Sequence, residues 1–489
     1  MVLICCLMLA IGTLVSSICL LISSIILLSF LLLILFPMLI IFLRQLLAYK
    51  KNLNKPINTT TIGIFHPYCN AGGGGERVLW KSIESLQKKY KNIKIYVYTG
   101  DVDVKPDEML KKVKDTFDIN LDKIDFIYLT RRKWVEAYMY PRLTLLAQSI
   151  GSMYLGFEAL YAFQPDIFID TMGYAFTYPL FKYLAGSKVV SYTHYPTIST
   201  DMLQQVQQRI VAHNNHQTIA NNPILSRVKI IYYQLFSVLY GYMGRCADIV
   251  MVNSTWTEEH INNIWKCPVK TFRVYPPCDI EHLVKLPLDD DDDKTNESIR
   301  IVSVAQFRPE KNHKLMINVL REVRDIVDDN VWKKIRLVLV GSCRNDDDKM
   351  RVDELKELSK TLGIDGNVEF KLNVTYDELI DEFKKGTIGL HAMWNEHFGI
   401  SVVECMAAGL ITIANNSGGP RADIVKTEFD NRTGFLASAV IEYATIIADV
   451  IHMNYDEKNI IRNSARLDVD RFSSKTFEKE FIRVIEPLF

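Results

Sequence analysis

The first 43 residues contain no charged side chain, and Leu, Ile and Phe are densest among residues 18–43. A transmembrane helix needs about 20 apolar residues. A secretory signal differs, because it has a basic start and a shorter apolar core. We therefore expect a membrane anchor in residues 1–45 with one main span at about 18–43, although a tight hairpin of two spans also fits. Arg44, Lys50 and Lys51 come next, and this positive charge predicts that the remaining chain is cytosolic.

The rest of the chain alternates short apolar runs with stretches of helical periodicity, which is typical of βαβ units and parallel sheets. The pattern divides into residues 60–285 and residues 299–470, and we expect one Rossmann-like domain in each, facing each other across a cleft. Residues 471–489 are expected to form a helix that packs back on the first domain. The predicted strands of the two domains are TIGIFHPY, KIYVYTG, DFIYL, DIFIDT, KVVSYTH and ADIVMVNS, then IRIVSVAQF, IRLVLVGS, NVEFKLN, TIGLHAM, LITIAN and TGFLA.

Charge and cysteine content exclude some classes of function. Lys plus Arg and Asp plus Glu both number 57, so the formal net charge is zero, which argues against nucleic acid as a partner. The nine cysteines include no CxxC pair and indicate buried free thiols. Five aspartates at 289–293 lie in a polar stretch beside the domain boundary. We interpret them as a solvated loop rather than a metal site.

A glycine-rich loop, NAGGGGER at residues 70–77, lies between a predicted strand and a predicted helix. Glycine lets the backbone approach a ligand closely, and a helix start offers unpaired N–H groups to an anion. The loop matches neither a P-loop nor a clean GxGxxG motif. The sequence therefore predicts a phosphate-binding loop of another class.

Two glutamates flank the start of a predicted helix in the second domain, with seven residues between them. Glu396 precedes the helix, and Glu404 is expected about two turns into it. Carboxylates accept hydrogen bonds from sugar and ribose hydroxyls. The amides of Phe398, Gly399 and Ile400 at the helix start can hold a phosphate.

Two basic residues, Arg308 and Lys311, follow the first predicted strand of the second domain in the stretch QFRPEKNH. Because ligands bind at the carboxyl ends of parallel strands, this position suits a diphosphate. Positive charge there stabilises a departing phosphate.

The motif set GGGGER, QFRPEKNH, Glu-x7-Glu, NNSGGP and RTGFLA occurs in this order and spans nearly all of residues 60–489. It resembles the retaining GT-B glycosyltransferases that carry the Glu-x7-Glu signature, and within them the mannosyltransferases of the dolichol pathway. The resemblance implies a GT-B fold and transfer of mannose from GDP-mannose to a dolichol-diphosphate-linked oligosaccharide. It also implies that the fourth and fifth mannoses are added in α-1,2 linkage with retention, on the cytosolic face of the endoplasmic reticulum. No metal or other cofactor is expected. Complexes with other mannosyltransferases of the pathway are expected.

The resemblance also assigns roles to residues. Glu396 contacts the donor sugar and supports positive charge at its anomeric carbon, and Glu404 binds the ribose. Arg308 and Lys311 neutralise the diphosphate, and the backbone of Gly73 and Gly74 approaches the phosphates and the acceptor. His194, at the end of a first-domain strand, contacts the donor. Many family members carry arginine where this chain has Gln306, so Arg308 is expected to supply that charge from a shifted position.

A second apolar stretch, residues 224–246, has no charge between Lys229 and Arg245. It is too short to span a bilayer and is expected to lie at a membrane surface, with a buried core helix as the alternative. Two other functions stay open. One is a related transferase that uses another sugar nucleotide or lipid-linked acceptor, and the other is an inactive membrane scaffold.

Overall fold

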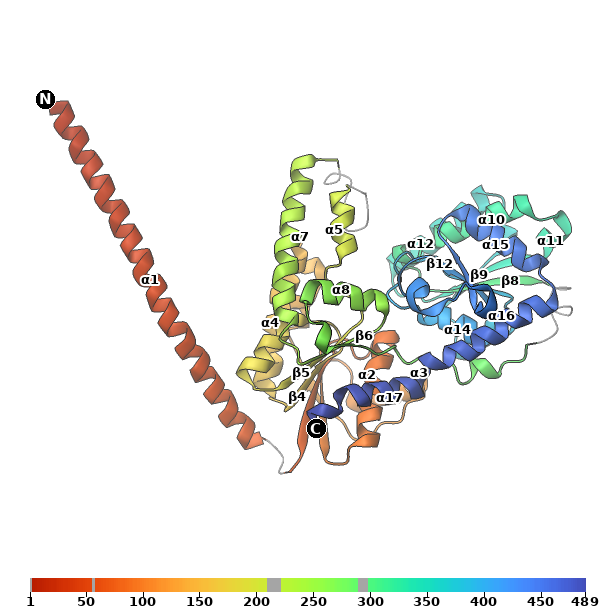
Figure 1. The fold of residues 1–489 in the computed structure, drawn as a ribbon, viewed down its shortest axis with the longest axis horizontal. Helices are drawn as coiled ribbons and strands as arrows, with labels where there is room; N and C mark the ends of the chain where they lie inside the picture. Colours follow the sequence, from red (N-terminus) through yellow and green to blue (C-terminus); the bar gives the residue numbers. More distant parts are fainter. Residues whose placement is uncertain (1, 55–57, 209–220, 289–297) are drawn as a thin grey trace.

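The computed structural model describes residues 2–54, 58–208, 221–288 and 298–489 (Figure 1). The aspartates at 289–293 lie outside these ranges. Helix α1 (Val2–Asn54) leads away from the body of the protein, and its last turns contact the first domain at η4 (Leu180–Leu184). Within the part of the chain that is described, no helix meets the length and apolarity needed to cross a membrane. Several side chains of the predicted span at 18–43 are outside that part, and the span stays a prediction.

The first domain is built on a seven-stranded parallel sheet with the order β3-β2-β1-β4-β5-β6-β7. Its strands are largely apolar on both faces because helices cover both sides, as is usual for parallel sheets. In β1, for example, Ile62 and Ile64 pack on one face while Phe65 packs on the other. The strands are β1 (Thr60–Phe65), β2 (Ile93–Thr99), β3 (Asp125–Tyr128), β4 (Ile167–Asp170), β5 (Lys188–Thr193), β6 (Ile249–Val252) and β7 (Thr271–Arg273).

The helices of the first domain fall into two groups. One group covers the Ile64 face and the other the Phe65 face, where α4 and α7 lie side by side (Figure 1). The hydroxyl of Tyr232 in α7 accepts a hydrogen bond from the Leu146 amide in α4 at 3.1 Å. The helices are α2 (Gly74–Lys89), α3 (Pro106–Phe117), α4 (Thr144–Ala162), α5 (Thr200–Gln207), α7 (Pro223–Gly244) and α8 (Thr255–Trp265).

The second domain repeats this plan with a six-stranded parallel sheet in the order β10-β9-β8-β11-β12-β13. The strands are β8 (Ile299–Val304), β9 (Ile335–Gly341), β10 (Val368–Leu372), β11 (Ile388–Leu390), β12 (Ile411–Asn415) and β13 (Gly434–Ala437). The helices are α10 (His313–Ile326), α11 (Asp329–Lys334), α12 (Asp346–Thr361), α13 (Tyr376–Lys385), α14 (Ile400–Ala408), α15 (Val440–His452) and α16 (Tyr455–Asp468).

The last helix, α17 (Ser474–Ile485), returns from the second domain to the first (Figure 1). Its Phe477 and Phe481 are buried in the same core as Val78 of α2. At the chain end, Phe489 stacks on Tyr90 with ring centroids 3.9 Å apart. The C-terminal segment thus completes one face of the first domain.

The two domains touch across the cleft that they form. The carboxylate of Asp423 in the second domain accepts a hydrogen bond from the Thr255 amide at 2.8 Å. The rings of Tyr195 and His397, one from each domain, stack 4.9 Å apart. These contacts bring the carboxyl ends of both sheets together, where ligands bind in such folds.

Candidate active site

The glycine-rich loop connects β1 to α2 and lies against the second domain. Gly73 is the N-cap of α2, and the amides of Gly74 and Gly75 have no hydrogen-bond partner among the described residues. A Cβ atom on Gly74 would lie 2.6 Å from Cδ1 of Ile400, the first residue of α14. Glycine at this position therefore allows the loop to approach the opposite wall of the cleft.

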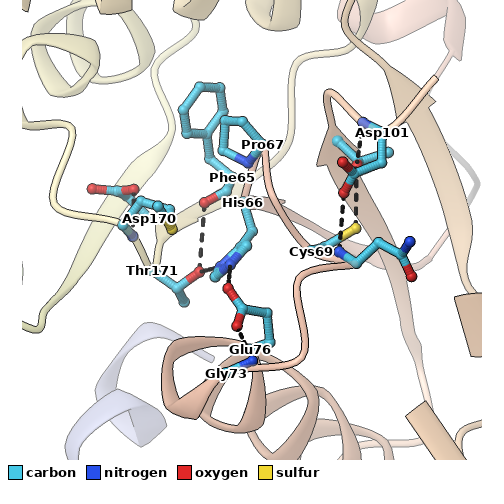
Figure 2. Close-up of polar contacts among 12 residues, drawn as sticks. Phe65, His66, Pro67, Cys69, Gly73, Glu76, Asp101, Asp170 and Thr171 are labelled. Carbon is cyan, nitrogen blue, oxygen red and sulfur yellow. Dashed lines mark hydrogen bonds and ion pairs between the residues drawn. The ribbon is translucent and has the colours of Figure 1, made fainter. Parts of the chain in front are cut away.

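A buried histidine organises the base of this loop, as Figure 2 shows. His66 follows β1, and its Nε2 lies 3.2 Å from Oε1 of Glu76 while its Nδ1 lies 2.7 Å from the Thr171 hydroxyl. The other carboxylate oxygen of Glu76 accepts the Gly73 amide at 2.5 Å. Burial alone would raise the pKa of Glu76, but the His66 hydrogen bond and the Gly73 amide lower it below its ordinary value. Glu76 is thus a carboxylate held by two neighbours, His66 and the Gly73 amide.

His194 lies at the end of β5 beside the same loop. Its Nε2 is buried and has no partner among the described residues, and a Cβ on Gly75 would lie 3.5 Å from it. Burial, with a smaller contribution from nearby His66, lowers the pKa of His194 to about 4. At neutral pH the ring is therefore uncharged and can accept or donate one hydrogen bond at the loop.

Glu396 lies in an ion cluster on the second domain. It pairs with the Lys311 ammonium, and its Oε2 is 3.3 Å from Nε2 of His391. Burial by itself would raise the pKa of Glu396, but His391 and Lys311 more than offset it and hold the pKa far below its usual range. Glu396 is consequently a carboxylate throughout the physiological pH range.

The backbone around Glu396 is fixed by the NNSGGP segment. The Gly419 amide donates to the Glu396 carbonyl at 2.8 Å, and the Ser417 hydroxyl accepts the Asn395 amide at 2.7 Å. A Cβ on Gly418 would lie 2.3 Å from the Glu396 carbonyl oxygen. The two glycines of this motif are required because the segment packs directly on the Glu396 backbone.

Helix α14 begins at Ile400, directly after the three residues whose amides were expected at its start. Gly399, with a φ of 114°, is its N-cap, and Glu404 is the fifth helical residue. The prediction that Glu404 lies two turns into the helix was wrong, because the helix starts only after this left-handed glycine. The amides of Phe398, Gly399 and Ile400 have no partner among the described residues. They stay available to an anion.

Glu404 has a different electrostatic environment from Glu396. Burial raises the pKa of Glu404 to about 7, and nearby Asp279 adds to this while Arg77 opposes it. Arg77 and Asp279 form an ion pair at 3.5 Å, and both line a cavity of ≈ 310 Å³ with Tyr376. The Glu404 carboxyl therefore feels the charges of two residues that line this cavity, Arg77 and Asp279.

The structure brings most of the predicted site residues to one cleft, but Arg308 differs. Lys311 pairs with Glu396, whereas the Arg308 guanidinium is 3.8 Å from Glu310 and its side chain is 41% exposed. Burial raises the pKa of Tyr195 in the first domain, and the nearby Arg308 charge opposes this rise.

Sequence reasoning missed His66, Glu76, His391 and the contact between Asp201 and Asn395. Asp201 of the first domain accepts the Asn395 side-chain amide at 2.6 Å, next to Glu396. A signal existed for His66, since FHPY and THYP both place a histidine directly after a first-domain strand. Asp201 carries no such signal, because its partner lies almost 200 positions away.

Among the described residues, no group of three or more His, Cys, Asp or Glu side chains is arranged to hold a metal ion. Positive charge in the cleft comes from Lys311, Arg308 and Arg77 instead. Helix starts at α2 and α14 add partial positive charge. The cleft can therefore bind a polyanion with hydroxyl groups at either end.

Comparison with known proteins agrees with this geometry. Residues 59–265 match the family described as ALG11 mannosyltransferase N-terminus, and residues 288–467 match Glycosyl transferases group 1. The chain is 51% identical to the GDP-Man:Man(3)GlcNAc(2)-PP-Dol alpha-1,2-mannosyltransferase of Xenopus laevis, over 88% of this chain and 87% of that protein. It is 49% identical to the protein of that name from Homo sapiens, over 91% of each.

Solved structures show the same architecture. A glycosyltransferase from Rickettsia africae has a TM-score of 0.59 at 15% identity and covers 88% of this chain and 99% of its own. At this identity the likeness concerns the fold alone. It confirms the predicted GT-B arrangement of two domains with parallel sheets.

Proposed function

The chain belongs to the family of GDP-Man:Man(3)GlcNAc(2)-PP-Dol α-1,2-mannosyltransferases, and from that premise we propose how its cleft works. It transfers mannose from GDP-mannose to a dolichol-linked oligosaccharide. The observation that carries this assignment is the 51% identity over 88% of the chain, and the two family matches cover both domains. The finer proposal is that it adds the fourth and fifth mannoses of that oligosaccharide.

In the proposed donor complex, Glu404 accepts the ribose hydroxyls and Glu396 engages the mannose. The diphosphate lies between them, against Lys311 and the amides of Phe398, Gly399 and Ile400. Arg308 approaches from the rim, and the glycine loop and His194 close the site from the first domain. The arrangement is supported by the unpaired amides at both helix starts and by the Lys311–Glu396 pair.

Glu404 gives the site a specific pH dependence. Since its pKa is raised to about 7, the carboxylate that accepts both ribose hydroxyls forms only as pH rises through this value. We predict that the ratio of GDP affinities, wild type over Glu404→Gln, grows from pH 6 to pH 8 by up to about tenfold, as expected for a hydrogen bond to a charged group. Calorimetry at both pH values measures it. The ratio cancels the titration of the GDP phosphates, and a flat ratio would refute the ribose contact.

The acceptor is a lipid, and an exposed apolar stripe on α7 offers a membrane contact. The stripe recurs every three or four residues and continues on α4 in Ile150, Tyr154, Phe157 and Tyr161. The Lys50 ammonium at the end of α1 lies 3.8 Å from the Tyr161 ring centroid, which joins the stripe to the N-terminal segment. The α7 residues are Ile224, Val228, Ile231, Leu235, Val238 and Tyr242, with exposures from 50% to 74%.

We therefore propose that this face lies on the bilayer, with residues 1–43 as the anchor and the catalytic domains in the cytosol. The other side of α7 is buried in the first domain through Tyr233, Phe236 and Tyr240. The helix therefore packs on the core with one side and offers its other side to the bilayer. An exposed sequon at Asn431 provides a check on the topology. Glycosylation of Asn431 in cells would place the body in the lumen and contradict the proposal.

The stripe has a measurable consequence. Replacing Leu235 and Val238 by glutamate should raise KM for a lipid-linked acceptor in vesicles by about tenfold or more, because burying such a side chain contributes about 1.5–3 kcal/mol. KM for GDP-mannose should not change. Leu467→Glu, at an 81% exposed position in the second domain, is the matched control. Equal effects of the Leu235/Val238 double variant and of Leu467→Glu on KM for the acceptor would show that the stripe does not face the membrane.

We propose that the reaction needs no divalent metal, since Lys311, Arg308 and the helix-start amides can neutralise the leaving diphosphate. Activity in excess EDTA should stay within about twofold of the untreated enzyme, where a lost metal would cost decades in rate. Abolished activity in EDTA that returns with manganese would contradict the proposal and reopen the metal interpretation of the aspartates at 289–293.

A related transferase with another donor or acceptor is the alternative, and an inactive scaffold is disfavoured by the intact Lys311–Glu396 pair. A screen of the purified chain with GDP-mannose, GDP-glucose and UDP-glucose against lipid-linked trimannosyl and pentamannosyl acceptors separates these functions. Transfer is expected only from GDP-mannose to the trimannosyl acceptor. Transfer from another donor supports the related enzyme, and none from any donor supports the scaffold.

A further inference from the structure

We propose that His66 is a positioning residue: through Glu76 it occupies the Gly73 amide and keeps the amides of Gly74 and Gly75 free for the donor diphosphate. The inference rests on the proposed donor site. It adds to that site the pair His66 and Glu76, which touches neither the mannose nor the ribose. Figure 2 shows the chain of contacts from Thr171 through His66 and Glu76 to Gly73.

The geometry places one hydrogen in this series of contacts. Glu76 accepts the Gly73 amide at 2.5 Å and lies 3.2 Å from His66 Nε2. A carboxylate can only accept, so Nε2 carries a hydrogen. The other ring nitrogen, Nδ1, lies 2.7 Å from the Thr171 hydroxyl, which is also 3.5 Å from the Phe65 carbonyl oxygen. Because His66 is 0% exposed and Thr171 1% exposed, this arrangement is shielded from water.

The contact between His66 and Glu76 keeps the Glu76 carboxylate from binding the amides that a phosphate would use at the start of α2. A carboxylate near a helix start is attracted to the same amides that a phosphate would use. Glu76 lies in the first turn of α2, where rotation of its side chain could bring an oxygen to Gly74 or Gly75. The hydrogen bond from His66 holds one oxygen at the buried side, and the second oxygen is then directed to Gly73. Without His66, Glu76 becomes an internal competitor of the diphosphate.

Two isosteric replacements of His66 separate positioning from general packing. In His66→Gln the side-chain amide can reach Glu76 as Nε2 does, whereas in His66→Asn it reaches only as far as Nδ1 and Thr171. We expect His66→Asn to weaken GDP binding by about tenfold, the equivalent of one hydrogen bond to a charged group, and His66→Gln by less than about threefold. KM for the acceptor should stay unchanged in both, and both melting temperatures are recorded.

The decisive variant adds Glu76→Gln to His66→Asn. Removing the competing charge should return most of the lost GDP affinity, so the double variant binds GDP more tightly than His66→Asn alone. A further loss in the double variant, or equal losses in His66→Asn and His66→Gln, would overturn the positioning role. If wild-type protein binds no GDP, the donor site itself fails. Normal GDP binding by both wild type and His66→Asn contradicts only the role of His66.

Discussion

Replacing Lys311 by alanine lowers kcat for mannose transfer by about two decades or more, a cost of a few kcal/mol in transition-state stabilisation. In the proposed reaction the leaving diphosphate gains charge as the glycosidic bond breaks, and Lys311 is the ammonium group already paired with Glu396 in the same cleft. Preorganised charge of this kind is usually the largest single contribution to catalysis. Single-turnover kinetics at saturating donor measure the effect on the chemical step.

The nearby Lys314 supplies the control. It is 65% exposed and pairs with Glu354 at 3.8 Å on the surface. Lys314→Ala should therefore keep kcat within about twofold of wild type, as surface ion pairs contribute little. Should Lys311→Ala retain wild-type turnover, the diphosphate must be stabilised elsewhere and the proposed site is wrong.

Replacing Glu396 by glutamine lowers kcat by about one to two decades while GDP affinity changes by less than about threefold. The carboxylate is needed when positive charge develops at the anomeric carbon, and GDP lacks the sugar that Glu396 engages. Because Lys311 and His391 hold the pKa of Glu396 far below its usual range, this effect should not depend on pH between 6 and 8. Parallel measurements of kcat and GDP affinity test the separation.

The expected pattern for Glu404→Gln is the reverse, with weaker GDP binding and a smaller effect on saturated turnover. Glu428→Gln, at an exposed loop position of the same domain, is the control for both. Equal effects of the Glu396 and Glu404 substitutions on GDP affinity would show that the two carboxylates do not divide the donor as proposed.

Local sequence patterns predicted the two sheets well. Each predicted apolar run contains a strand, because a parallel sheet covered by helices buries both faces of a strand such as Ile249–Val252. Helix starts were less predictable. The start of α14 depends on the left-handed Gly399, which the apolar run VVECMAAG does not reveal. Helix α7 has apolar residues on both its buried and its exposed side. The amino-acid composition of the segment therefore could not show which side contacts the core and which is free to contact a membrane.

Within the proposed site, the residues predicted from sequence are those that lie in compact motifs. Lys311, Glu396, Glu404 and the glycine loop were predicted because each follows a strand or precedes a helix in a recognisable block. The contacts that hold these residues in place were not predicted, since they join distant parts of the chain. The Asp201–Asn395 hydrogen bond connects the two domains, and the His66–Thr171 contact spans 105 positions. Such pairs follow from topology rather than from spacing.

Retention of configuration is what the family resemblance implies, and it needs a chemical route in this site. Retaining glycosidases usually use a carboxylate nucleophile about 5 Å from a carboxylic acid. Here Glu396 is already paired with Lys311 and His391 on the donor side. We propose instead a same-face substitution through an oxocarbenium-like transition state, in which the departing phosphate oxygen takes the proton of the acceptor hydroxyl. The bond to the phosphate breaks as the bond to the acceptor oxygen forms, and GDP leaves with the proton.

Analysis of the product is the measurement that tests this account most directly. The purified full chain is incubated with GDP-mannose and the lipid-linked trimannosyl acceptor, and the released glycan is examined by mass spectrometry and α-1,2-mannosidase digestion. The account predicts a gain of up to two hexoses, both removed by the enzyme, and no sugar bound covalently to the protein. A β-linked product or a trapped mannosyl–protein adduct would contradict it.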